Sequence, residues 1–348
     1  MFIFYSILLF SFLIFVHEFG HFITAKLSGV QVNEFAIFMG PAIFKKQVGE
    51  TLYSIRLIPI GGYCAMEGED EETDNPRAFC RAKWWKRLII LVAGAAMNFI
   101  IGVLLLFIVF SNYKSLDTTV FLKAEEGCTV FREDGIHLGD RLLEIDGERV
   151  YLSNDFSMLM TLSDGSPDIV VERDGEKLYF KDYQMETHLF GNEKEERYGF
   201  QFGYIKNTFA NRLRYTWDYS IDMIRAVRLS FRMIFTGQAG IQDMSGPVGI
   251  VQVMSDSASQ ADTKLGAYLT ILLFGGFLAI NLAVMNLLPI PALDGGRVVG
   301  LLLTTAIEKI TRKKVSPKIE GYIHGIGMIL LLALMAVIMF KDVIFLFK

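Results

Sequence analysis

The chain contains 348 residues, of which 52% are hydrophobic and 21% are charged, and it has a formal net charge of −4. A mean hydropathy of +0.37 is too high for ordinary soluble domains, although the length would accommodate two or three of them. The composition therefore indicates a membrane protein, and the charge gives no support to a nucleic-acid partner.

Four stretches approach the roughly 20 apolar residues that an α-helix needs to cross a bilayer. They are Phe2–Ile23, Leu88–Phe110, Tyr268–Leu288 and Ile323–Phe340. A buried helix of a soluble core is the alternative for any one of them, but three of the four are nearly uninterrupted Leu, Ile, Val, Phe and Met. The first lacks the basic start and small-residue cleavage site of a signal peptide, so we expect it to stay in the mature protein.

The first predicted span contains His17-Glu18-Phe19-Gly20-His21. Its two imidazoles are four residues apart and project from one face of a helix, so both can ligate one metal ion. Neutral imidazole is a common zinc ligand, and Glu18 can accept a proton from a water whose pKa the ion has lowered toward about 7. A chance match is the alternative, but ionisable groups within a span are costly and usually mark a functional site.

A β-hairpin is predicted between the first two spans. Thr51–Tyr63 alternates as a strand does and is expected to end in a turn at Pro59-Ile60-Gly61-Gly62. The earlier run Val32–Met39 has similar β-forming character, ends at Gly40-Pro41, and is the expected partner. An acidic, solvated loop follows at Glu67–Asp74.

Residues 116–203 are predicted to form one small soluble domain. Short β-rich runs at Asp168–Arg173 and Lys177–Phe180 alternate with Asp-Gly turns at 146–147 and 174–175. The segment Gly135–Val150 (GIHLGDRLLEIDGERV) resembles the central signature of PDZ domains, in which a Gly-x-x-x-Gly-Asp turn leads into a strand and a tight turn. A generic β-rich module is the alternative, because this string is short and rich in turns.

Residues 208–236 are predicted to form an amphipathic helix. Apolar residues recur at helical spacing while arginines lie largely elsewhere around the helix. The apolar set is Trp217, Ile221, Ile224, Val227, Phe231 and Ile234. Two placements fit this pattern equally well: the helix lies near the membrane surface, or it packs against the PDZ-like domain.

A catalytic zinc normally has three protein ligands and one position open for water, so two His are too few. The best candidate for the third ligand is Asp294, in the segment Asn286–Gly296 (NLLPIPALDGG) at the end of the third span. Pro289 and Pro291 interrupt the helix there and free carbonyl groups that only a water-lined cavity can satisfy within a membrane. The alternative is a loop that simply leaves the bilayer, with Asp294 capping a helix.

Basic residues indicate which loops are cytoplasmic. They gather before the second span and between the third and fourth, so both of these loops are expected in the cytoplasm, with the termini and residues 116–203 outside it. The two clusters are Arg81, Lys83, Lys86 and Arg87, and Arg297, Lys309, Arg312, Lys313, Lys314 and Lys318.

Weak evidence against this topology comes from Lys264, Lys341 and Lys348. The topology also separates Cys128 from the other two cysteines, so no disulfide framework is predicted.

Over essentially its full length the chain resembles the bacterial site-2 proteases, intramembrane metalloproteases that cleave membrane-anchored anti-sigma factors and related single-span proteins. The resemblance rests on the motifs His17–His21 and Asn286–Gly296, the strand with its Gly61-Gly62 pair, the PDZ-like domain, and Ser245–Ile250 (SGPVGI). Members often have Ala-Gly-Pro-x-x-Asn in the second span. Here Ala93–Asn98 (AGAAMN) lacks the proline, a difference that concerns the geometry of the span and not the chemistry.

This resemblance implies roles for individual residues. Residues matching His17, His21 and Asp294 bind one Zn²⁺ in the family, the residue matching Glu18 is the catalytic base, and the one matching Asn286 helps hold the substrate. Asn98 is as compatible with packing between helices as with a place near the site, so no catalytic role is assigned to it.

The family also implies that a membrane-re-entrant β-hairpin, here about Val32–Tyr63, lies against the extended substrate, with Gly61 and Gly62 as substrate-binding residues. Pairing along the edge of a strand is a general mode of peptide recognition and agrees with this placement.

The expected fold is a polytopic α-helical membrane protein with about four transmembrane helices, a membrane-re-entrant β-hairpin and an inserted small β-rich PDZ-like domain. Residues 1–111 hold the first two spans and the hairpin, and 116–203 the PDZ-like domain. Residues 204–264 form an amphipathic juxtamembrane segment, and 265–348 hold the last two spans.

The expected activity is that of a zinc metalloprotease in the bacterial cytoplasmic membrane, acting on single-span membrane proteins such as anti-sigma factors or signal-peptide remnants. The PDZ-like domain, on the extracytoplasmic side, either binds a peptide or gates access. The main alternative is a non-proteolytic zinc-binding membrane scaffold or chaperone, but a structural zinc site needs no acid-base residue such as Glu18. A small-solute transporter is a third possibility, although the spans show no internal repeat.

Overall fold

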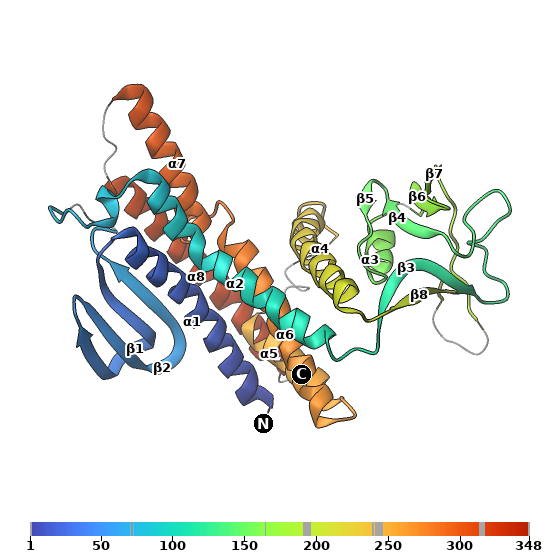
Figure 1. The fold of residues 1–348 in the computed structure, drawn as a ribbon, viewed down its shortest axis with the longest axis horizontal. Coiled ribbons are helices and arrows are strands. Elements are labelled where there is room, and N and C mark those ends of the chain that lie inside the picture. The colour runs from blue at the N-terminus through green and yellow to red at the C-terminus, as the bar shows by residue number, and fades with distance from the viewer. Residues whose placement is uncertain are drawn as a thin grey trace. The chain divides into compact units, whose positions relative to one another are not determined.

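A computed structural model describes residues 2–69, 71, 73–163, 165–190, 196–238, 240, 246–312 and 317–346 (Figure 1). The chain divides into two compact units. The second unit is Phe107–Asp222, and the first unit comprises Met1–Leu106 together with Met223–Lys348. Of the residues singled out from the sequence, Ser245, Lys313, Lys314 and Lys348 lie outside the described residues, as does the side chain of Lys318.

The first unit contains the long apolar helices. They are α1 (Phe2–Ser28), α2 (Trp84–Phe110, whose last turn belongs to the second unit), α6 (Lys264–Asn286) and α8 (Pro317–Leu346). Each contains a stretch long and apolar enough to cross a membrane, so the prediction of four such helices is confirmed. The protein is a membrane protein with a helical core.

Shorter helices complete this unit. They are α5 (Pro247–Ser259), the single-turn η1 (Phe79–Arg81) and α7 (Asp294–Thr311), which begins at the predicted zinc ligand Asp294. A buried apolar cluster joins η1 and α7 to α1, α2 and the hairpin and includes Val30, Phe35, Phe79, Ile90 and Leu301. Because this core reaches four different elements, it fixes the hairpin against the helices.

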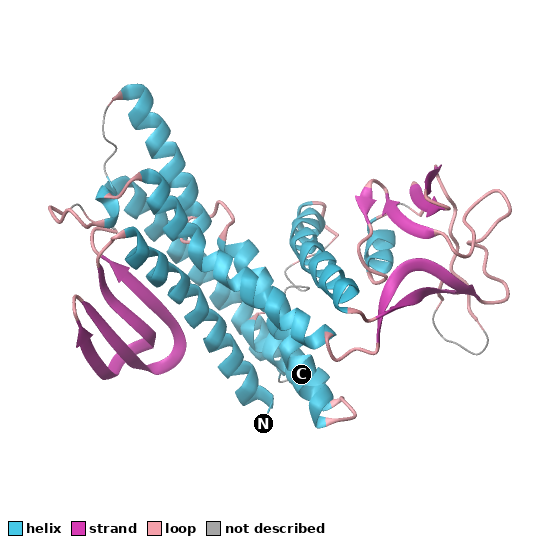
Figure 2. Ribbon diagram, in the orientation of Figure 1, coloured by secondary structure: helices cyan, strands magenta, loops and turns pink. Residues whose placement is uncertain are grey.

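The hairpin consists of β1 (Val32–Val48) and β2 (Thr51–Met66), and Figure 2 shows its strands beside α1. Both strands are longer than predicted. The expected end of the first strand at Gly40-Pro41 and of the second at Pro59–Gly62 is wrong, because both strands bend there and then continue. Because β2 bends back on itself, Phe35 of β1 pairs with Tyr53 from the first part of β2 and with Cys64 from its last part. The start of β1 therefore lies between the two ends of β2. The left-handed backbone of Gly40 and Gly61 produces bends and not chain breaks.

The second unit is built on a sheet of strand order β7-β6-β4-β3-β8, with β5 paired to β4. Its strands are β3 (Ser115–Ala124), β4 (Arg141–Ile145), β5 (Glu148–Arg149), β6 (Ile169–Arg173), β7 (Glu176–Phe180) and β8 (Phe200–Lys206), and its short helix is α3 (Asp155–Leu162). The predicted tight turns at Asp146-Gly147 and Asp174-Gly175 are confirmed, with all four residues in the left-handed region. Phe121, Phe156, Phe200 and Phe202 pack ring against ring in its core.

The predicted amphipathic helix is confirmed as α4 (Phe209–Phe235). Its first half belongs to the second unit, where Tyr215 donates a hydrogen bond of 2.5 Å to Asp117 on β3. Phe110 contacts the rings of both Tyr215 and Tyr219. This half of α4 therefore packs against the β-rich unit, which agrees with the second of the two placements predicted from the sequence. A place near the membrane surface for the rest stays a prediction.

Candidate metal centre

His17 and His21 lie one turn apart on α1, with their Nε2 atoms separated by 3.2 Å. The Nδ1 atom of His21 is 2.8 Å from the backbone carbonyl of Ile90 on α2. Donation from Nδ1–H to that carbonyl leaves the Nε2 lone pair of His21 available to a metal ion, which is how outer partners commonly orient ligating imidazoles. The imidazole of His21 is thus held by α2 as well as by α1.

Gly94 on α2 provides the space that the two imidazoles occupy. A Cβ atom at this position would overlap Nε2 of His21 and lie 2.7 Å from Cε1 of His17. Only glycine lets the α2 backbone approach the imidazoles this closely. Sequence reasoning missed this role, although the run of small residues Ala93–Ala96 was the available signal.

Asp294 reaches the same point from the first turn of α7. Its Oδ2 atom is 3.1 Å from Nε2 of His17 and 3.3 Å from Nε2 of His21. The loop Leu287–Leu293 that precedes it folds back onto α7, where Cβ atoms on Gly295 or Gly296 would overlap its carbonyl groups. The two glycines therefore allow the tight return that places the carboxylate beside the histidines.

These three side chains fit a zinc ion. Ligand atoms at about 2.0–2.1 Å from a tetrahedral zinc are separated from one another by about 3.3 Å, close to the spacing of the two Nε2 atoms and Oδ2. Oδ2 of Asp294 is buried and accepts no hydrogen bond of good geometry from the part of the chain that is described. The described residues contain no other group of three such metal-ligating side chains. A cation satisfies the three converging lone pairs.

Glu18 lies next to His17 and lines the same cavity, which has a volume of about 840 Å³. Within the described residues, the other acidic side chains along it are Asp294, Glu67, Glu69 and Glu71. Arg297, one turn after Asp294, forms an ion pair with Glu69 at the cavity. The cavity is thus polar although it adjoins apolar helices, as hydrolysis within a membrane requires.

Of the predicted substrate-binding residues, two lie at this site and one does not. Nδ2 of Asn286 is 3.4 Å from Nδ1 of His17. A Cβ atom on Gly62 would be 3.5 Å from Cγ of Glu18, so this part of β2 runs beside Glu18. Gly61 instead faces the side chain of Met39, away from Glu18 and the histidines. Asn286 and Gly62 are thus close to the metal-site residues, although none of the three lines the cavity itself.

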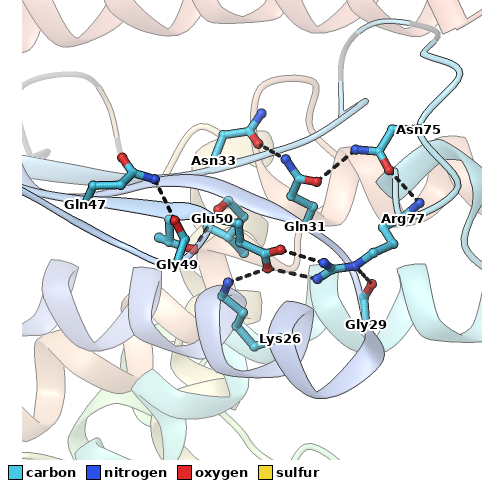
Figure 3. A network of polar contacts seen from close by, with 11 residues as sticks. Lys26, Gly29, Gln31, Asn33, Gln47, Gly49, Glu50, Asn75 and Arg77 are labelled. Carbon is cyan, nitrogen blue, oxygen red and sulfur yellow. Dashed lines mark hydrogen bonds and ion pairs between the residues drawn. The ribbon is translucent and has the colours of Figure 1, made fainter.

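A polar network fixes the base of the hairpin, as Figure 3 shows. Glu50, between the two strands, accepts a hydrogen bond of 2.7 Å from Lys26 on α1 and bonds of 2.5 and 2.8 Å from Arg77. Hydrogen bonds from Arg77 and Lys26 lower the pKa of Glu50 to about 2. Gln31 links this region to Asn33 and Asn75. The hairpin that brings Gly62 to Glu18 is therefore anchored to α1 at its other end.

The chain is similar to known metalloproteases along most of its length. The model of peptidase family M50 matches residues 5–334. Two clostridial proteins provisionally named zinc metalloproteases are similar: one from Clostridium acetobutylicum (37% identical; 98% of this chain, 96% of the relative) and one from Clostridium perfringens (34%; 99% of each). The regulator of sigma-W protease RasP of Bacillus subtilis is 26% identical over 97% of each chain.

Proposed function

Because this chain belongs to peptidase family M50, the site-2 protease family, and is a zinc metalloprotease, we propose that it cleaves single-span membrane proteins within or beside the lipid bilayer. The observation that carries the proposal is the location of the metal-binding atoms. His17 and His21 lie well inside the apolar helix α1 and adjoin a polar cavity. Ionisable groups at such a depth are retained for function.

His17, His21 and Asp294 would hold one zinc ion through two Nε2 atoms and Oδ2. When bound there, zinc lowers the pKa of a water molecule toward about 7 and polarises the scissile carbonyl. The carbonyl of Ile90 keeps the imidazole of His21 in the orientation that directs Nε2 at the ion.

Glu18 would act as the general base. It follows His17 directly on α1, lines the cavity and is not one of the three clustered ligands. Its carboxylate can take a proton from the attacking water and then deliver a proton to the leaving amine. The acidic cavity provides a route by which water reaches Glu18 from outside the apolar helices.

The hairpin would present the substrate. Gly62 lies beside Glu18, which supports pairing of an extended substrate with this part of β2, while Asn286 holds the substrate from α6. Gly61, at the bend just before, would shape the strand without lining the cavity. A hairpin in this role enters the membrane from one side and leaves on the same side.

The β-rich unit would be a PDZ-like domain outside the cytoplasm, centred on the predicted range 116–203. The Gly139-Asp140 turn that leads into β4 supports this assignment. Its carboxylate at Asp140 accepts bonds of 2.7 Å from Nε and Nη2 of Arg173 and 2.8 Å from the N–H of His137. Such a domain would either bind a peptide or limit the size of the proteins that reach the cavity.

Anti-sigma factors and signal-peptide remnants are the substrate classes we propose. They combine a single apolar span with little folded mass on one side, which suits a cavity that adjoins membrane helices. The name of the Bacillus subtilis relative refers to regulation of sigma-W, and this supports the first class for the present chain.

The test is cleavage of single-span proteins, tagged at both ends, by the purified protein in liposomes. Wild type should release fragments. Glu18→Gln keeps the shape and should retain zinc, but loss of a general base should slow cleavage by roughly 10²- to 10⁴-fold. Glu308→Gln, an exposed change at the far end of α7, is the matched control and should cut normally. Wild-type cleavage by a zinc-loaded Glu18→Gln protein would show that Glu18 is not the base.

A further inference from the structure

We infer that His324 on α8 is a positioning residue for the metal centre, because it holds the loop Leu287–Leu293 that delivers Asp294. This inference rests on the proposed role of Asp294 as a zinc ligand. The decisive contact is a hydrogen bond of 3.0 Å from the backbone N–H of Ala292 to Nδ1 of His324. Ala292 is two residues before Asp294, so a shift of its backbone moves the carboxylate directly.

The loop has few ways to satisfy its backbone among apolar helices. Pro289 and Pro291 have no N–H. The N–H groups of Ile290 and Leu293 donate to carbonyls within the loop at 2.7 and 3.1 Å, and that of Leu288 donates to Met285 in the last turn of α6 at 3.1 Å. The N–H of Ala292 instead donates to a side chain of another helix. This bond ties the loop to α8 and satisfies an N–H group that the apolar helices alone would leave without a partner.

Ala292 also has a strained backbone, with φ at +83°. Residues with a Cβ atom rarely adopt this left-handed conformation, and it persists only where the surroundings hold it. The hydrogen bond to His324 is a contact of this kind. If it were lost, Ala292 could relax toward an ordinary conformation and draw Asp294 away from the histidines.

The backbone of α8 lies against the same loop. A Cβ atom on Gly327 would overlap Cβ of Pro291 and lie 2.8 Å from the carbonyl carbon of that proline. Gly327 is three residues after His324, so both face the loop from one side of α8. Met328, the next residue, lines the cavity together with Ala292. Two independent contacts therefore connect α8 to the segment that carries the carboxylate.

The position of His324 within the sequence agrees with this role. It lies in the apolar stretch Gly321–Asp342, where an ionisable side chain is costly and usually has a functional partner. As an acceptor at Nδ1, its imidazole is neutral, with the proton on Nε2. A leucine of similar size would fill the space but could not accept the hydrogen bond.

The test uses the full-length zinc-loaded protein in detergent and measures the rate of zinc release to a chelator. Loss of an outer partner of a metal ligand typically costs about 10- to 100-fold in metal affinity, so His324→Leu should release zinc roughly 10-fold faster or more. In His324→Asn, Oδ1 can take the place of Nδ1, and release should stay within about threefold of wild type. Tyr322→Phe, at an exposed position of α8, is the control and should not change the rate.

Gly327→Ala provides a second, independent variant. It keeps His324 but pushes α8 away from Pro291, and it should also accelerate zinc release. If His324→Leu does not accumulate, the zinc-release rate of Gly327→Ala alone tests whether α8 positions the loop. Equal release from wild type, His324→Leu and Gly327→Ala would overturn the inference, and so would an Asn variant as fast as the Leu variant.

Asp294→Ala separates this inference from the proposed site itself. If Asp294→Ala leaves zinc release unchanged, the proposed ligand set is wrong and the positioning role fails with it. If Asp294→Ala accelerates release while the α8 variants do not, the ligand set stands and only the role of His324 is refuted.

Discussion

At the level of single residues, three acceptor atoms converge at the metal centre, and too few hydrogen-bond donors lie between them to satisfy all three. Two imidazole Nε2 atoms and one carboxylate oxygen lie 3.1–3.3 Å apart, and Oδ2 of Asp294 accepts no well-formed hydrogen bond within the described chain. A buried carboxylate in this state is unfavourable unless a cation compensates it. Zinc therefore stabilises the arrangement in addition to its chemical role, which leads to two predictions.

The first prediction concerns the metal content. Purified wild-type protein should contain about one zinc per chain, and His17→Ala or Asp294→Ala should lower the affinity because each removes one of three ligands. Elemental analysis after dialysis measures this. His188→Ala, which removes an imidazole from the second unit beside Thr129, is the control and should leave the content unchanged. Stoichiometric zinc in both His17→Ala and Asp294→Ala would disprove the proposed site.

The second prediction concerns Gly94, whose missing side chain makes room for the imidazoles. Gly94→Ala should abolish or strongly reduce zinc binding, because the added methyl group would overlap Nε2 of His21 and displace this ligand. Gly102→Ala on the same helix is the matched control, since its Cβ would press on Ile280 of α6 and not on a ligand. Both variants should lose about 1–3 kcal/mol of stability through overpacking.

Zinc content and thermal stability, measured on both glycine variants, distinguish a site-specific effect from general strain. If Gly94→Ala keeps its zinc, or if both variants lose it equally, the close approach of α2 is not what shapes the site.

At the scale of elements, hydropathy located the four long helices because a membrane-spanning stretch is a local property of the sequence. His17–His21 and Asp294 could be singled out for the same reason, since each lies in a compact motif. The continuation of both hairpin strands beyond their bends could not be predicted. Gly-Pro and Pro-Ile-Gly-Gly indicate a change of direction but not whether strand pairing resumes afterwards. The close approach of Gly94 and the support from His324 depend on neighbours more than 30 residues away, which no local pattern contains.

The β-rich unit gives a prediction at this scale. Although burial alone would raise it, the hydrogen bonds from Arg173 and from the N–H of His137 lower the pKa of Asp140 below its ordinary value. A carboxylate with a lowered folded-state pKa stabilises the fold fully above its unfolded pKa of about 3.9 and loses that contribution as the pH falls further. Asp140→Ala should cost roughly 3 kcal/mol at pH 7 and should flatten the pH dependence below pH 4.

Trp217 fluorescence reports unfolding of this unit in a background where Trp84 and Trp85 are replaced by Phe. Glu172→Ala is the control, because its pair with Arg141 is long at 3.8 Å and exposed, and it should cost less than about 1 kcal/mol. A pH profile identical in wild type and Asp140→Ala would refute the role given to the Asp140–Arg173 pair.

At the scale of the whole molecule, contacts within the first unit place the helix ends in two groups. Lys86 at the start of α2 donates a hydrogen bond of 2.7 Å to the carbonyl of Ser28 at the end of α1. At the opposite end of α1, the ring of Tyr5 contacts Tyr268 near the start of α6. The basic residues around the start of α2 therefore gather at the same end as Ser28, and the N-terminal end of α1 lies at the other.

This grouping leads to a prediction about topology. Basic residues favour the cytoplasmic side, so the end with Ser28 and Lys86 should face the cytoplasm, and the chain that leaves α2 at Phe110 should emerge outside it. In a background with the three native cysteines replaced by Ser, a membrane-impermeant thiol reagent should label Tyr179→Cys on intact cells but not Ile310→Cys. Both side chains are exposed, so access to the reagent depends on the side of the membrane. Permeabilised cells should label both. Labelling of Ile310→Cys alone on intact cells would invert the topology and place the β-rich unit in the cytoplasm, where it could not select extracytoplasmic parts of a substrate.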